Sequence, residues 1–146
     1  MIGIIVVAHA AIGTEMVKAA KHIMPSAKHI IGVDIDSDKP TEFIREQISD
    51  AVKQVDDGDG IIILTDMFGG TPSNICLSCL SDKKIEVISG FNLPMLVKLV
   101  CISSDSKLEE VVPFIREYGQ KNIIIANQIL HSEQKTKNER KPEINT

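Results

Sequence analysis

Short apolar runs rich in Ile and Val alternate along the chain with longer segments whose apolar residues recur at helical spacing. A strand that is buried on both faces is apolar throughout, so each run predicts a strand of a parallel sheet. The predicted strands cover residues 2–8, 29–34, 60–65, 84–89 and 121–129, and the predicted helices cover about 13–24, 37–55, 71–80, 92–103 and 106–120. Pro113 is expected to bend or interrupt the last of these helices.

This alternation predicts an α/β fold, a doubly wound and mostly parallel sheet with helices on both of its faces. No internal repeat and no linker divides the chain, so a single domain is expected over residues 1–130. The segment 131–146 is polar and mixed in charge, and we expect it to be a disordered tail.

Composition narrows the classes of function. Only 3% of the 146 residues are aromatic and the net charge is −4, which disfavours nucleic-acid binding because both stacking surface and basic charge are scarce. The sequence shows neither a secretion signal nor an apolar run of about 20 residues, so we expect a cytoplasmic protein with reduced thiols. The pair Cys76 and Cys79 lies inside a predicted helix, which disfavours redox or metal chemistry; any role for this pair stays unassigned.

Two polar residues follow strands that should be neighbours in the sheet. His9 directly follows the first predicted strand, and Asp66 directly follows the third. In doubly wound sheets, ligands bind beyond the carboxyl ends of the strands, near the point where the strand order reverses. A strand order 2-1-3-4 brings His9 and Asp66 within hydrogen-bonding reach. The carboxylate would fix the tautomer of the imidazole and make its other nitrogen a better nucleophile.

A glycine-rich turn follows the aspartate. Gly69 and Gly70 allow backbone N–H groups to approach a ligand, and a helix is expected to start there with Thr71 as its N-cap and Pro72 in its first position. The turn would therefore cradle an anion beside His9. Each of these residues also has an ordinary explanation as a core histidine, a turn or a helix cap. The functional interpretation depends on their convergence on one site.

Three motifs together resemble the mannose-type enzyme IIA domain of the bacterial phosphoenolpyruvate-dependent sugar phosphotransferase system. They are "VVAHAAIG", "TDMFGGTPSN" and "GFNLPML", and the resemblance covers about residues 1–130. It implies a phosphotransferase component in which His9 accepts a phosphoryl group from the histidine-containing phosphocarrier protein and passes it to a IIB subunit on a separate chain. It further implies that Asp66 bonds the unphosphorylated ring nitrogen, that Gly69, Gly70 and Thr71 contact phosphate, and that Phe68 and Asn92 border the site.

The resemblance also implies a quaternary structure. The last strand, here about residues 121–126, would be exchanged in a homodimer and would add antiparallel to the partner's sheet. Association with a membrane transporter complex would go through protein partners, and no cofactor or metal is implied. One departure is Ala10, because many relatives carry Gly after the histidine.

Two other functions remain open for the same His9. One is the phosphoryl-donor subunit of a dihydroxyacetone kinase, and the other is a regulatory phosphoprotein that is not coupled to transport. The sugar cannot be read from the sequence, because such a subunit would contact only protein partners and the phosphoryl group.

Overall fold

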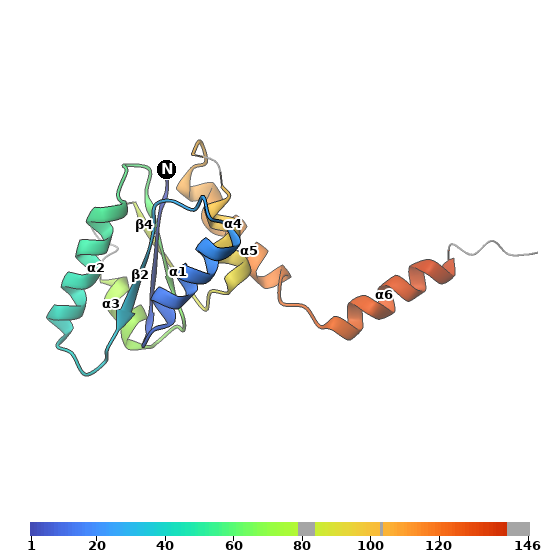
Figure 1. Cartoon of the computed structure of the whole chain (residues 1–146), viewed down its shortest axis with the longest axis horizontal. Helices are drawn as coiled ribbons and strands as arrows, with labels where there is room; N and C mark the ends of the chain where they lie inside the picture. The colour runs from blue at the N-terminus through green and yellow to red at the C-terminus, as the bar shows by residue number, and fades with distance from the viewer. Residues whose placement is uncertain (79–83, 103, 140–146) are drawn as a thin grey trace, which may run out of the picture.

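The computed structural model describes residues 1–78, 84–102 and 104–139. Its centre is a four-stranded parallel sheet with the strand order β2-β1-β3-β4 (Figure 1). The strands are β1 (Gly3–His9), β2 (Ile30–Ile35), β3 (Ile61–Thr65) and β4 (Ile85–Ser89). All four begin one residue after the start of a predicted apolar run, and the predicted α/β class and parallel sheet are confirmed.

Helices cover both faces of the sheet. On one face lie α2 (Thr41–Val55) and α3 (Thr71–Leu77), and on the other lie α1 (Ile12–Ile23), α4 (Leu93–Val100) and α5 (Leu108–Lys121). Figure 1 shows these two layers on opposite sides of the strands, with α6 (Ala126–Glu139) projecting away from them.

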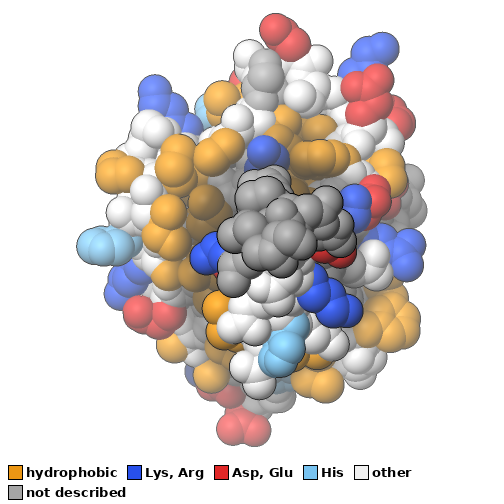
Figure 2. All heavy atoms as spheres, turned by 90° about the vertical axis from the view of Figure 1, so that its right-hand side faces the viewer, with side chains coloured by type: hydrophobic (Ala, Val, Ile, Leu, Met, Phe, Trp, Pro, Cys, Tyr) orange, Lys and Arg blue, Asp and Glu red, His pale blue; other side chains and the backbone are white. Residues whose placement is uncertain are grey.

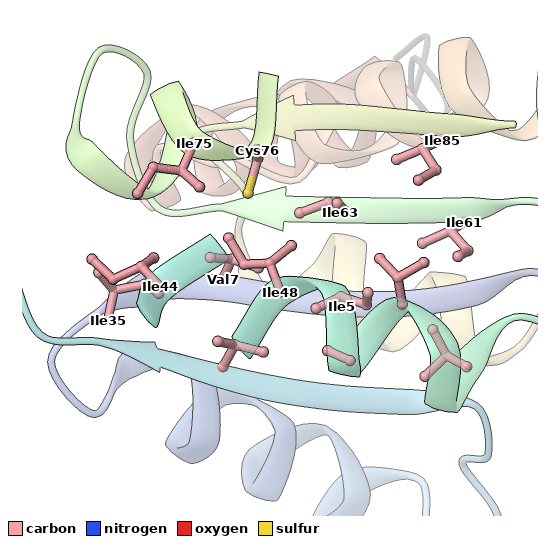
Figure 3. Packing of buried hydrophobic residues seen from close by; sticks show 14 residues of the cluster. Ile5, Val7, Ile35, Ile44, Ile48, Ile61, Ile63, Ile75, Cys76 and Ile85 are labelled. Carbon is pink, nitrogen blue, oxygen red and sulfur yellow. The ribbon is translucent and has the colours of Figure 1, made fainter. Parts of the chain in front are cut away.

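The sheet divides the buried core into two clusters that share no residue. Along β1, Ile5 and Val7 belong to the cluster on the α2 and α3 face, whereas Ile4 and Val6 belong to the cluster on the opposite face. This alternation follows from the period of two residues in a strand, with both faces covered. Figure 3 shows the first cluster, in which the helical residues Ile44, Ile48, Ile75 and Cys76 pack over the strand residues Ile5, Val7, Ile61 and Ile63.

The register of the strands places the ends of β1 and β3 at one edge of the sheet. Val7 lies opposite Thr65, the last residue of β3, and His9 lies opposite Ile35, the last residue of β2. Asp66 therefore follows β3 at the level where β1 reaches its final residues. This register is what allows the two polar side chains to meet.

Helix α5 runs from Leu108 to Lys121 with Pro113 inside it, so the predicted interruption is wrong. A proline in a helix removes one backbone hydrogen bond and crowds the preceding turn. Val111 and Ile115, on either side of Pro113, are buried in the core and hold both halves of the helix against the sheet. Tertiary packing thus outweighs the local preference of the proline.

The prediction of a fifth strand over residues 121–129 is wrong for the single chain. Lys121 ends α5, residues 123–125 have no regular secondary structure, and Ala126 begins α6. Ile123, Ile124 and Ile125 are 75%, 57% and 60% exposed, so this apolar run has no strand beside it within the described chain. A short apolar run indicates that the segment is buried by something, but it does not indicate which element of the same chain or of another chain buries it. Its exchange between two copies involves a second chain and stays a prediction.

The start of the expected disordered tail is instead part of α6. This helix has no buried residue, and its last nine residues, 131–139, belong to the segment expected to be a tail (Figure 1). Figure 2 views the molecule from the side on which α6 projects and shows hydrophobic side chains gathered on the surface around it. The exposed Ile123–125 segment, Ile129 and Leu130 lie along this projection.

Candidate functional site

His9 and Asp66 form a hydrogen-bonded pair at the carboxyl edge of the sheet. Asp66 Oδ2 lies 2.8 Å from His9 Nδ1, and the same oxygen accepts the backbone N–H of His9 at 2.9 Å. The other oxygen, Oδ1, accepts the backbone N–H of Met67 at 3.0 Å. The contact predicted from the strand ends is therefore present, and both oxygens of the carboxylate are engaged.

The pair fixes the charge of Asp66 and the tautomer of the His9 ring. Burial by itself raises the pKa of Asp66. The hydrogen bonds from the backbone and ring of His9 lower it by more than burial raises it, so the pKa lies below its ordinary value. Asp66 is therefore ionised at neutral pH, and a carboxylate can only accept hydrogen bonds. Nδ1 must then carry the proton, which leaves the lone pair of Nε2 available as a nucleophile. The His9 side chain is 34% exposed, so a reactant can reach it.

The loop from Asp66 to Gly70 returns to the His9 ring at Gly70. A Cβ placed on Gly70 would lie 2.9 Å from His9 Cε1 and 3.5 Å from His9 Nε2, so the backbone of Gly70 lies close to the Cε1 and Nε2 edge of the ring. Gly69 has a positive φ of 83°, a conformation that glycine adopts without strain. Met67 and Phe68 are exposed at the tip of this loop, with Phe68 74% exposed.

Helix α3 begins one residue earlier than the sequence predicts. Gly70 is the N-cap, in an extended conformation and without a side-chain cap bond, and its carbonyl accepts the Asn74 N–H at 3.0 Å. Thr71 is therefore the first helical residue, and its hydroxyl does not cap the helix, so the N-cap prediction for Thr71 is wrong. Thr71 is exposed at the end of the loop that borders His9.

Asn92 is held in structural bonds. Its side-chain oxygen accepts the Met95 N–H at 3.1 Å and caps α4, and its amide group donates to the Gly119 carbonyl of α5 at 2.9 Å. Asn92 and Phe68 line the same groove beside β4. The structure thus places Asn92 near the loop, with its amide joining two helices.

Sequence reasoning missed a set of bonded hydroxyls next to the site, two of them buried and that of Ser89 half-buried. Thr65 Oγ1 donates to Ser89 Oγ at 2.7 Å, and Ser73 Oγ lies 3.3 Å from the same Ser89 Oγ. These bonds tie the ends of β3 and β4 to the first turn of α3, next to Asp66 and Gly70. The only sequence signal was a hydroxyl at each of these element ends.

Ala10, which follows His9, has a positive φ of 51°. An L-residue in this region is strained by roughly 1–2 kcal/mol, whereas glycine is not. The strain gives a physical reason for the glycine that the resemblance leads us to expect after the histidine.

Metal and disulfide chemistry find no support among the residues that the structure describes. No group of three or more His, Cys, Asp or Glu side chains there is placed to hold a metal ion. Cys76 is buried in the core, Cys101 is exposed, and Cys79 lies outside the described residues. In the same part of the chain, no helix has the length and apolar character that crossing a membrane requires.

Comparison with known proteins decides the family. A family model described as the fructose IIA component of the PTS system matches residues 3–116. The chain belongs to this family. Among solved structures, the phosphotransferase system component EIIA of Streptococcus agalactiae superposes with a TM-score of 0.77 at 28% identity, covering 88% of this chain and 99% of that one.

Two curated relatives show how the chain compares in length with other family members. The chain is 27% identical over 124 residues to the mannose-specific EIIAB component of Escherichia coli, covering 84% of this chain but only 38% of that protein. It is 22% identical over 131 residues to the fructose-specific EIIA component of Bacillus subtilis, covering 89% and 90% of the two chains. The chain thus spans less than half of the EIIAB protein and nearly all of the EIIA protein.

Proposed function

We propose that this chain is a phosphocarrier of the sugar phosphotransferase system, with His9 as the residue that carries the phosphoryl group. The observation that carries the proposal is the His9–Asp66 pair, in which a carboxylate holds Nδ1 at 2.8 Å and Nε2 remains free. Family membership supports the system, and the position of the pair at the carboxyl ends of β1 and β3 supports the site.

The transfer follows from the protonation of the pair. The lone pair of Nε2 attacks the phosphorus of a phosphohistidine on the histidine-containing phosphocarrier protein, and the N–P bond of the donor breaks as the new one forms. His9 keeps the proton on Nδ1, so its phosphorylated ring is a cation, and the carboxylate of Asp66 stabilises that charge. Transfer to a IIB subunit reverses these steps with a second acceptor. No cofactor or metal takes part.

The phosphoryl group on Nε2 would be received by the loop that ends at α3. Because Gly70 lies against the Cε1 and Nε2 edge of the ring, a group bonded to Nε2 would lie beside the backbone of Gly70. In this proposal the neighbouring Gly69 backbone and Thr71 hydroxyl contact the same group. Backbone N–H groups and a hydroxyl are suitable donors to phosphoryl oxygens.

The proposed assembly is a homodimer in which residues 121–126 add antiparallel to β4 of the partner. β4 is the last strand of the sheet, so one of its edges has no strand beside it among the residues that the structure describes. The groove next to β4 is lined by apolar side chains that include Val87, Ile88 and Val112. The exposed Ile123–125 segment has the composition to fill such a groove, and pairing it with β4 would cover both apolar surfaces.

Phosphorylation by the upstream components tests the proposal. Incubation with phosphoenolpyruvate, enzyme I and the histidine phosphocarrier should add one phosphoryl group that is stable to base and lost in acid. His9→Ala should abolish labelling, whereas the exposed His22→Ala and His131→Ala serve as matched controls and should be labelled normally. Persistent labelling of the His9→Ala protein would reject the assignment. Discharge by a IIB subunit and sugar, rather than by a soluble kinase, separates sugar uptake from the dihydroxyacetone kinase alternative.

A further inference from the structure

The N-terminus of α1 is capped by a side chain from another element. The N-cap residue, Ala11, makes no side-chain cap bond, because a methyl group cannot accept one. Asp34 of β2 supplies the acceptor: its Oδ1 accepts the backbone N–H of Thr14 at 2.8 Å, and its Oδ2 accepts the Thr14 hydroxyl at 2.6 Å. Thr14 is the third helical residue, whose N–H is ordinarily satisfied by the N-cap side chain.

Close backbone contact holds the same turn of α1 against the sheet. A Cβ on Gly13 would lie 2.7 Å from the Val33 carbonyl and 2.9 Å from the Val6 carbonyl, so only glycine allows the helix to start this close to β1 and β2. The carboxylate of Asp34 and the glycine at position 13 together fix where α1 begins relative to the two strands.

Only Ala10 and Ala11 separate this fixed turn from His9. Ala10 donates its N–H to the Ile35 carbonyl at 3.1 Å and adopts a φ of 51°. A residue other than glycine holds such a conformation only when its surroundings impose it. The constraint comes from both sides, since β1 is paired with β2 before Ala10 and α1 is anchored to Asp34 after Ala11.

We propose that Asp34 is a positioning residue for His9. Its bonds to Thr14 hold the Ala10–Ala11 turn in its strained conformation, and that turn presents the His9 backbone N–H and ring to Asp66. The inference rests on the proposed phosphoryl transfer by His9. Asp34 acts through Thr14 and the turn, so its loss should lower the rate of transfer without changing the binding of the phosphoryl donor.

Two substitutions weaken the bonds between Asp34 and Thr14, which anchor the start of α1, in different ways. Asp34→Asn leaves one oxygen and loses the acceptor for the other bond, and Thr14→Val removes the hydroxyl while keeping the side-chain shape. We expect each to reduce the single-turnover rate of His9 phosphorylation about 10-fold, as for loss of an outer group that orients a reactive one. The half-saturating concentration of the histidine phosphocarrier should stay within about twofold of the wild-type value, since neither substitution changes the surface that binds this partner.

Two control variants separate the positioning effect of Asp34 from the loss of a negative charge and from a change in the stability of α1. Asp36→Asn removes a carboxylate from the same end of the sheet, but its partner is the Asp38 N–H of its own loop, so it should leave the rate unchanged. Thr14→Ser keeps the hydroxyl and should restore most of the wild-type rate. If Asp34→Asn does not fold, the Thr14→Val and Thr14→Ser pair decides the question.

A double substitution tests the link through Ala10. Glycine adopts a positive φ without strain, so an Ala10→Gly chain should need the anchor less. We expect Thr14→Val to cost about 10-fold in the wild-type background and less than about threefold in the Ala10→Gly background, a non-additive result that indicates coupling through the turn. Equal losses in both backgrounds would mean that Asp34 serves only as a helix cap.

The nitrogen-15 chemical shifts of the His9 ring give a readout that needs no phosphoryl transfer. In the wild-type protein they should report a proton on Nδ1, and in Asp34→Asn they should move towards a mixture of tautomers. Ring shifts and rates in Asp34→Asn equal to those of Asp36→Asn would overturn the proposal. A wild-type chain that accepts no phosphoryl group would reject the proposed function, while the ring shifts would still decide whether Asp34 positions His9.

Discussion

At the scale of single residues, the site depends on the two oxygens of one carboxylate. Asp66 Oδ2 accepts both the backbone and the ring N–H of His9, and Oδ1 accepts the Met67 N–H. An amide at this position would place an NH₂ group against at least one N–H donor, whichever way it is turned. It would also lack the negative charge that stabilises a phosphorylated imidazole cation.

Asp66→Asn should therefore slow phosphoryl transfer to His9 by about 10- to 100-fold, in the range expected for loss of an orienting group. The fold should be retained, because the side chain lies at the lip of the sheet and belongs to neither core cluster. Rapid-quench phosphorylation measures the rate, and circular dichroism of the same sample checks the fold. A variant that transfers at the wild-type rate would show that Asp66 stabilises the loop after β3 but does not orient or activate His9.

The same carboxylate makes stability depend on pH. The pKa of Asp66 is lowered in the folded protein from 3.8, so its bonds to His9 stabilise the folded state fully above about pH 4 and lose that contribution as the pH falls through the lowered value. We expect Asp66→Asn to be less stable than wild type in urea unfolding at pH 6. At pH 3 and below, the difference should shrink. A difference that is constant from pH 6 to pH 2 would contradict this.

Gly70 should be sensitive to the addition of a single methyl group. Its φ of −79° suits alanine, but the added Cβ would lie 2.9 Å from His9 Cε1 and would push the ring from its place against Asp66. Gly70→Ala should slow transfer by about 10- to 100-fold, since a displacement of about 1 Å can cost that much.

Gly69→Ala is the comparison for Gly70→Ala. A Cβ there meets no atom within 4 Å, but φ is 83°, so stability should fall while the ring keeps its position. Equal transfer rates for wild type and Gly70→Ala would show that the loop shifts to accommodate the methyl group and that the His9 ring keeps its position.

The sequence predicts the central pair of the site but not its support. His9 and Asp66 could be paired in advance because each ends an apolar strand, and the strand order makes those ends adjacent. The bond between Asp34 and Thr14 could not be predicted, because it joins residues 20 positions apart whose spacing has no periodic signature. The left-handed conformation of Ala10 was equally hidden, since alanine gives no signal for a positive φ.

At the scale of elements, burial decided which predictions were confirmed. The two central strands, β1 and β3, were predicted well because they are buried along almost their whole length and are therefore almost entirely apolar. The outer strands β2 and β4 are only partly buried, but their Ile and Val residues still marked them. The run at residues 123–125 has a similar apolar composition but is exposed and has no strand beside it in the described part of the chain, so composition alone misassigned it. The N-cap of α3 was misplaced by one residue, because Gly70 and Thr71 are both acceptable at such a position.

Helix α5 offers a test of packing against local preference. Pro113 costs helix stability, and proline in a helix interior is about 3 kcal/mol less favourable than alanine. Replacing Pro113 by alanine should recover this cost, but the replacement also frees the unfolded chain, which proline restricts by about 0.4–1 kcal/mol. Pro113→Ala should raise the free energy of unfolding by about 2 kcal/mol, measured by urea denaturation. The exposed Glu109→Ala on the same helix is a control and should change stability little. A less stable Pro113→Ala protein would mean that α5 is shaped around the proline.

At the scale of the whole molecule, the described part of the chain leaves uncovered the apolar Ile123–125 segment and the apolar groove beside β4, whose lining includes Ile123. In the proposed homodimer each surface covers the other, and each protomer contributes one strand to its partner. A chain cut after Asn122 keeps all of α5 but loses residues 123–126 of the exchanged segment, including its three isoleucines.

The full chain should be a dimer by analytical ultracentrifugation, and the chain cut after Asn122 should aggregate, because an open apolar strand edge pairs with other chains. A chain cut after Glu139 retains α5 and α6 and should remain dimeric, which controls for the loss of the C-terminal residues. A full-length chain that sediments as a monomer, or a truncated one that stays soluble and monomeric, would contradict the exchange.

The division of the core by the sheet has a consequence for how this sequence can diverge. The two clusters share no residue, and neither contains His9 or Asp66. A substitution in one layer can be compensated by its own neighbours without disturbing the other layer or the lip of the sheet. Sequences can therefore drift one layer at a time while the short motifs at the strand ends stay in place. Such drift would let a chain diverge to 28% identity with the Streptococcus agalactiae protein and still superpose on it with a TM-score of 0.77.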